Sequence, residues 1–126
     1  MSAPDIGPSY INVEQRGDVF VVEVAEPHLA NDDNIEGFGK ELFLVLDKLD
    51  CRKMALTLAG MDVVSSSFLG KLITLHRRMH RRNGTLVICD LRDRMARVFR
   101  NTHLENYFTI CDTMEDAFEL LGQRSS

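Results

Sequence analysis

The stretch from Lys53 to Arg82, KMALTLAGMDVVSSSFLGKLITLHRRMHRR, predicts a strand, a serine hinge and a helix in succession. Apolar residues dominate from Met54 to Leu58, as in a buried strand, and helical periodicity of about four turns follows the serines at 65–67. The first N–H groups of such a helix have no partners within it, so serine oxygens or an added anion would satisfy them. We expect any switch in this chain to lie at this hinge.

Segments on both sides of this unit complete an α/β pattern. A Gly17-Asp18 turn separates two β-rich segments, and an Asn83-Gly84 helix stop precedes the apolar run TLVIC. The predicted order is β-β-α-β-α-β-α-β-α, a mixed sheet of about five strands with about four α-helices, in which right-handed crossovers join parallel strands. The first expected strand begins at Tyr10, and the other four cover Val19 to Val24, Met54 to Leu58, Thr85 to Cys89 and Tyr107 to Cys111. The expected helices cover Ile35 to Leu49, the segment after the serines, Leu91 to Arg100 and Met114 to Leu121.

The length of 126 residues, of which 44% are hydrophobic and 27% charged, suits one packed core. We expect a loose segment at 1–9, one domain at 10–122 and a tail at 123–126. The first residues lack the pattern of a signal peptide, so we expect neither a leader nor a membrane span, and Cys51, Cys89 and Cys111 form no CxxC pair. These features favour a soluble protein in a reducing cytoplasm, without membrane insertion.

No constellation of side chains indicates an enzyme or a cofactor. His76 and His80 are four residues apart but lack the glutamate of a zinc-protease helix, and no Gly-rich phosphate loop follows a strand. The acidic pairs, such as Asp32-Asp33, lie in loops or at helix starts, where acids serve as caps. The sequence therefore predicts a non-enzymatic protein that holds neither metal nor cofactor.

A basic run, Lys71 with six further His and Arg residues at 76–82, lies along the second predicted helix. The net charge of −4 argues against general nucleic-acid binding, and no aromatic side chains interleave with this run. Two interpretations remain: a solvated face that complements the helix dipole, or a contact for an acidic partner at the rim of the hinge.

Serine phosphorylation would act strongly at the hinge. A serine at a helix start is most often a simple cap. A phosphate there would add about −1.5 to −2 charges beside free N–H groups and the helix dipole, which can accept them. The fold would survive while a docking surface around the hinge changed, as a protein-protein switch requires.

The order of elements, the hinge, the Asn83-Gly84 break and the segment RMARVFRNTHLENYFTI together resemble the STAS domain, the fold of bacterial anti-sigma factor antagonists. The resemblance spans Tyr10 to Leu121. The family's core motif reads Asp-Ser-Ser/Thr-Gly-Leu-Gly, where this chain has Ser-Ser-Ser-Phe-Leu-Gly at 65–70. Ser66 matches the family's phosphoacceptor.

This resemblance implies a partner switch. The unphosphorylated domain would bind an anti-sigma factor that is also a serine kinase and carries the ATP, and a phosphatase would reset the domain. Ser67 would cap the helix. Ser65 and Phe68 replace the family's aspartate and glycine, and Phe68, if exposed, could serve as an apolar anchor. The implied partner-binding residues are Asn31, Asp32, Ser65, Ser67, Phe68 and Lys71.

The sequence thus predicts an anti-sigma factor antagonist that is switched by phosphorylation on Ser66. The alternative is a STAS scaffold that is never phosphorylated, either in a signalling complex or as an accessory subunit of a membrane transporter. Under both hypotheses the partners are proteins rather than nucleic acid, and a homodimer is also possible.

Overall fold

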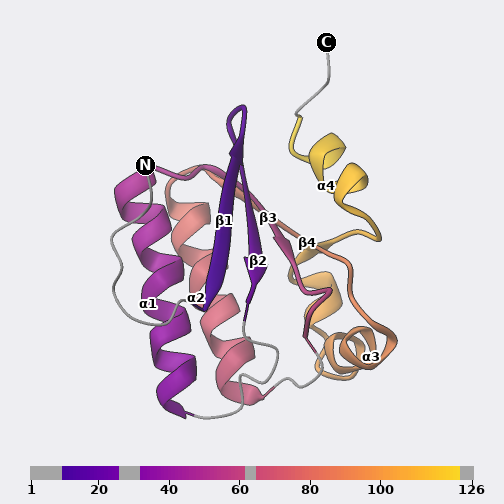
Figure 1. The fold of residues 1–126 in the computed structure, drawn as a ribbon. Helices are drawn as coiled ribbons and strands as arrows, with labels where there is room; N and C mark the ends of the chain where they lie inside the picture. Colours follow the sequence, from indigo (N-terminus) through magenta and orange to yellow (C-terminus); the bar gives the residue numbers. More distant parts are fainter. Residues whose placement is uncertain (1–9, 26–31, 62–64, 123–126) are drawn as a thin grey trace.

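Strands and helices alternate along the chain in the computed structural model, which describes residues 10–25, 32–61 and 65–122 (Figure 1). The order is the predicted one, so the fold class is confirmed. The last strand is shorter than expected, because only Thr109 and Ile110 pair with the neighbouring strand. The elements are β1 (Ile11–Arg16), β2 (Val19–Val24), α1 (Asp32–Leu49), β3 (Lys53–Thr57), α2 (Ser66–Arg81), β4 (Thr85–Cys89), α3 (Asp93–Asn101), the 3-10 turn η1 (Leu104–Asn106), β5 (Thr109–Ile110) and α4 (Met114–Leu120).

The five strands of this part of the chain form one mixed sheet in the order β1-β2-β3-β4-β5. Strands β1 and β2 are an antiparallel hairpin, and each later strand runs parallel to the one before it. The register places Phe20, Met54 and Leu86 side by side. Helices α1 and α2 are therefore crossovers that bring the start of α2 to the carboxyl end of β3, where open α/β sheets place their ligands.

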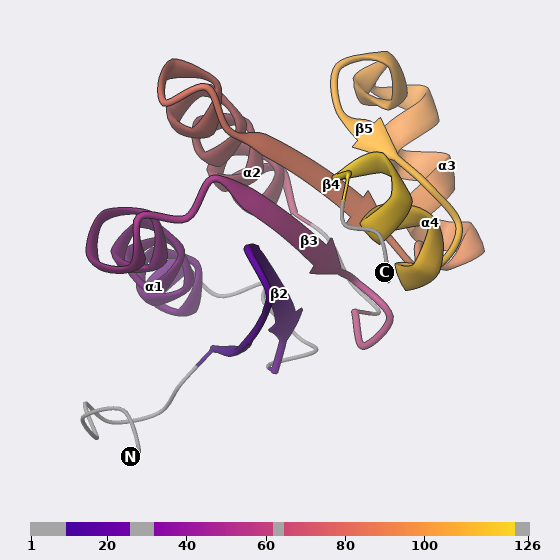
Figure 2. The same cartoon turned by 90° about the horizontal axis from the view of Figure 1, so that it is seen from above.

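Two apolar clusters fill the two faces of the sheet. Helices α1 and α2 cover one face and α4 covers the other (Figure 2). The larger cluster contains the core side chains of α1, α2 and α3, and the smaller one joins the strands to Ala117 and Leu121. Because alternate strand residues point to opposite faces, β3 contributes Met54 and Leu56 to the first cluster and Ala55 to the second.

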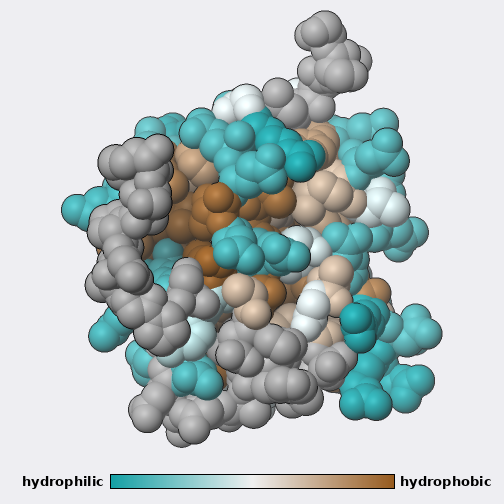
Figure 3. Space-filling model, in the orientation of Figure 1, coloured by the Kyte–Doolittle hydropathy of each residue, from teal (hydrophilic) through white to brown (hydrophobic). Residues whose placement is uncertain are grey.

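Strand β1 is an edge strand, and hydrogen bonds at its start join it to α1. The backbone N–H groups of Tyr10 and Ile11 both donate to Oε1 of Glu41, at 2.7 and 3.1 Å. The Tyr10 ring lies so close to Gly37 that a side chain there would collide with it. Apolar surface remains visible beside β1 (Figure 3), and Val13 in that strand is 39% exposed.

Candidate functional site at the start of α2

Ser65, rather than Ser67, caps α2. Its backbone is extended, and its Oγ accepts a hydrogen bond from the N–H of Phe68 at 3.1 Å. Its carbonyl accepts the first intrahelical bond, from the N–H of Leu69. The expectation that Ser67 caps the helix is wrong because Ser67 already lies inside the first turn, where its backbone is helical.

Ser66 is the first residue of α2 and is exposed. Its hydroxyl makes no hydrogen bond to any residue that the structure describes, since Ser65 fulfils the capping role. The first turn of α2 contains no acidic residue. An anion on Ser66 would therefore meet free N–H groups and the positive end of the helix dipole without a repelling carboxylate in that turn.

Phe68 is a core residue. Its side chain is fully buried and stacks on Phe38 of α1, with ring centroids 5.1 Å apart and an interplanar angle of 24°. The exposure on which a role as an apolar anchor depended is therefore not present in this structure. The ring points inward because the capped first turn directs the N3 position of α2 toward α1, and it joins the two helices just below the hinge.

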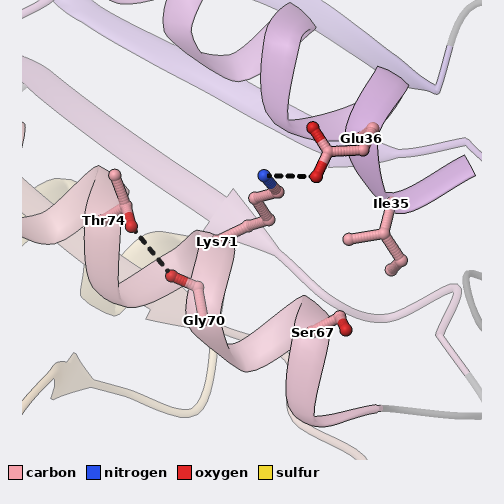
Figure 4. A pocket seen from close by; sticks show the side chains of 6 residues that line it. All are labelled: Ile35, Glu36, Ser67, Gly70, Lys71 and Thr74. Atoms are coloured by element: carbon pink, nitrogen blue, oxygen red, sulfur yellow. Dashed lines mark hydrogen bonds and ion pairs between the residues drawn. The ribbon is translucent and has the colours of Figure 1, made fainter. Parts of the chain in front are cut away.

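An open groove of about 450 Å³ runs between α1 and α2 beside the hinge (Figure 4). Lys71 crosses it, with Nζ 3.2 Å from Oε2 of Glu36. Gly39 makes room for the Lys71 stem, because a Cβ at this position would lie 2.8 Å from the lysine Cδ. The groove is lined by Ile35, Glu36, Ser67, Gly70, Lys71 and Thr74.

The groove brings two predicted partner-binding residues, Ser67 and Lys71, together on one surface. Asp32 is the first residue of α1, whose first turns supply Ile35 and Glu36 to the groove, and Asn31 lies outside the described residues. Sequence reasoning did not identify Glu36. The small residues of α1 were the available indication, because glycine in a helix permits a close approach by a neighbouring helix.

A second feature that the sequence did not reveal fixes the residues that directly follow β3. Thr57 is the one buried polar side chain in the described part of the chain, and its Oγ1 donates to Oδ2 of Asp90 at 2.7 Å. The same Oγ1 accepts from the N–H of Ala59 at 3.3 Å. Nε of Arg92 donates to the carbonyl of Ala59 at 2.9 Å. Hydrogen bonds thus join the residues that directly follow β3 to those that directly follow β4.

The basic run of α2 serves several different roles. The guanidinium of Arg78 lies 4.1 Å from the centroid of the Phe43 ring, and Arg82 donates to the carbonyl of Leu46 at 2.6 Å. The ring centroid of His76 lies 4.7 Å from that of Tyr107, and its buried Nδ1 has no hydrogen-bond partner among the residues that the structure describes. Part of the run therefore packs against neighbouring elements instead of forming only a solvated face. No group of three or more possible metal ligands occurs among the described residues.

Acid should destabilise the fold through His76. Burial, and secondarily the neighbouring His80, lower the pKa of His76 from its ordinary value of 6.5. The unfolded chain then binds more protons than the folded one as the pH falls through about 6.5, so stability declines from about pH 7 toward pH 5. Urea denaturation at each pH should show a smaller decline for His76→Phe than for the wild type. His80→Gln, on the same helix, should keep most of the decline, and equal declines in wild type and His76→Phe would contradict this assignment.

The three cysteines are free thiols, and Cys51 and Cys89 are fully buried. Burial is the largest cause of the shift in the pKa of each of these two thiols, and it raises both pKa values to about 12. They are therefore protonated and unreactive at neutral pH, which fits a packing role. None of the helices in the described part of the chain has the length and apolar character needed to cross a bilayer.

Comparison with known proteins gives consistent matches. The STAS domain family matches residues 10–117. The proposed anti-sigma factor antagonist BtrV of Bordetella bronchiseptica is 27% identical over 89 residues, which cover 71% of this chain and 76% of BtrV. A STAS domain protein from Planctomyces limnophilus superposes with a TM-score of 0.79 at 19% identity, covering 89% of this chain and 97% of that one. The phosphorylated form of the Bacillus cell fate determinant SpoIIAA superposes with a TM-score of 0.67 at 14% identity, covering 87% and 97%. These structural likenesses establish the fold, and the match over residues 10–117 shows that the chain belongs to the STAS domain family.

Proposed function

We propose that this protein is an anti-sigma factor antagonist whose contact with a protein partner is switched by phosphorylation on Ser66. One observation carries the proposal: at the start of α2, Ser66 presents an exposed hydroxyl that bonds to none of the described residues, while Ser65 keeps the helix capped. Membership of the STAS family and the similarity to BtrV support the same function.

The partner in this proposal is an anti-sigma factor that is also a serine kinase. It carries the ATP, so the STAS protein holds no cofactor, and a phosphatase restores the hydroxyl. In this proposal the docking surface comprises the hinge and the groove with Ser67 and Lys71. It also includes Asp32, the first residue of α1, and Asn31 before it. A switch of this kind acts on transcription and therefore in the cytoplasm.

The two departures from the family motif are compatible with this proposal. Ser65 retains the capping function of an aspartate but carries no charge, so a phosphate on Ser66 has a neutral neighbour. Phe68 turns its ring into the core, which leaves the approach to the Ser66 hydroxyl open. A phosphate here would spare the helix, yet it would repel acidic groups of a docked partner and disturb close packing.

The test uses the partner that co-purifies with the full chain from its own cells. Ser66→Asp should weaken binding by about tenfold or more, which is at least about 1.4 kcal/mol. Ser66→Ala should bind normally but should not be released when ATP is added. Gln15→Glu adds the same charge on β1, away from the hinge, and should bind like the wild type. Binding can be measured by calorimetry, with phosphopeptide analysis of the segment containing 65–67.

If neither substitution at Ser66 changes affinity or release, the switch is not at this residue. A stable partner without phosphate on any of the three serines would instead favour the scaffold.

A further inference from the structure

Helix α3 exposes an arginine face. Arg94, Arg97 and Arg100 are all exposed and follow each other at three-residue spacing, opposite the buried Met95 and Phe99. None of the three forms an ion pair with any residue that the structure describes. Hydrophilic side chains cover α3 in the surface view (Figure 3). This face of the helix is available to carboxylates from outside the chain.

Helix α4 exposes the opposite charge. Glu115, Asp116 and Glu119 are exposed, whereas Ala117 packs against the sheet. These carboxylates also have no ion-pair partner within the described ranges. Beside them, the apolar side chain of Leu120 is 54% exposed, although its neighbour Leu121 is buried. The α4 surface thus combines an acidic face with one exposed apolar side chain.

A cavity of about 290 Å³ lies next to the arginine face. Residues of α3, of the segment before it and of β5 contribute apolar surface to this cavity, and Arg100, Glu105 and Asn106 contribute polar surface. Such a cavity can receive an aliphatic side chain that has carboxylate side chains next to it on the same helix. The apolar residues that line it are Leu91, Ala96, Phe99 and Ile110.

We propose that two copies of this chain associate about a twofold axis, with α3 of each copy against α4 of the other. Both helices lie at the β5 end of the molecule, away from α1, in two perpendicular views (Figures 1 and 2). A twofold axis between them forms both contacts at once, because an isologous interface pairs each surface with its complement on the other copy. Leu120 of one copy enters the α3 cavity of the other. This surface consists of residues of α3 and α4 and includes none of the hinge serines, so the inference goes beyond the proposed function.

Charge complementarity favours a second copy over nucleic acid as the occupant. Three arginines meet three carboxylates in each half of the interface, and guanidinium groups bind carboxylates through paired hydrogen bonds. A long polyanion would meet the carboxylates of α4 and a chain of net charge −4. Exposed ion pairs contribute little each, so the dimer is weak and sensitive to salt.

Sedimentation velocity of the full chain at roughly 10 to 300 µM tests the proposal. The wild type should show a monomer-dimer equilibrium whose dissociation constant rises at least about tenfold between 50 and 500 mM NaCl. The double variants Arg94→Glu with Arg97→Glu, and Glu115→Arg with Glu119→Arg, should each be monomeric. An equimolar mixture of the two should dimerise, because each reversed face then meets its opposite.

The matched control is Arg77→Glu with Arg81→Glu, on exposed residues of α2. This variant has the same change in net charge as Arg94→Glu with Arg97→Glu, and it should dimerise like the wild type. Circular dichroism melts establish that each variant is folded before it is scored. A wild type that stays monomeric at all these concentrations would overturn the proposal. So would growth beyond a dimer, a dimer that survives either double variant, or a folded mixture that fails to associate.

Discussion

Phe68→Ala should lower the free energy of unfolding by about 3 to 5 kcal/mol. The wild-type ring is fully buried in the larger cluster, and its removal would leave a cavity between α1 and α2. The stacking on Phe38, at 5.1 Å between centroids, adds about 0.5 to 1.5 kcal/mol to the apolar contribution. Urea denaturation followed by circular dichroism measures the loss.

Leu44→Ala is the matched control, because Leu44 is an apolar residue of α1 that is 45% exposed. It should lower stability by less than about 1 kcal/mol. Phe68→Leu should fall between the two, since leucine refills part of the space. A loss below about 1 kcal/mol for Phe68→Ala would mean that the ring leaves the core, and Phe68 would again be a candidate anchor for a partner.

The sequence predicted the fold well where local patterns are strong. The β-branched run Val19–Val24 and the apolar run Thr85–Cys89 form strands with the predicted bounds, because turn residues limit both. Helix starts were less accurate. The expected helix at Leu91 begins at Asp93, after an N-cap Arg92 that makes no side-chain capping bond and so leaves no recognisable capping residue in the sequence.

The candidate site was predictable in position but not in detail. Periodicity located the hinge before α2, yet three adjacent serines have the same capping chemistry, so only geometry distinguishes Ser65. The orientation of Phe68 depends on its contact with Phe38, which is distant in sequence. Pairing of Thr57 with Asp90, 33 residues later, likewise depends on the register between β3 and β4.

Removing the Asp90 carboxylate should destabilise the residues that directly follow β3. Asp90 has a φ of +62°, a conformation that glycine adopts without strain, so Asp90→Gly deletes the carboxylate and spares the backbone. The buried Thr57 hydroxyl would then have no carboxylate acceptor. We expect the free energy of unfolding to fall by about 1 to 3 kcal/mol.

Thr57→Val and the double variant complete the test. Valine keeps the shape of threonine, and the half-buried Asp90 carboxylate can turn to water, so this variant should lose only about 1 kcal/mol. If the two groups act through their mutual hydrogen bond, the double variant should lose about 0.5 to 1.5 kcal/mol less than the sum of the single losses. Strictly additive losses would show that Asp90 acts on something other than Thr57.

Hydrogen exchange tests whether this pair holds the residues that directly follow β3. The Ala59 N–H donates to Oγ1 of Thr57, and that oxygen is fixed by its bond to Asp90. In Asp90→Gly the hydroxyl can rotate, and in Thr57→Val the acceptor is gone, so the Ala59 amide should exchange faster in both variants. Asp90→Asn is the control, because asparagine tolerates positive φ and its amide oxygen still accepts from Thr57. If the exchange rate of the Ala59 amide were unchanged in Thr57→Val, the hydrogen bond between Thr57 and Asp90 would not hold the segment that contains Ala59. Faster exchange would mean that the hydrogen bond between Thr57 and Asp90 holds the start of the segment that follows β3.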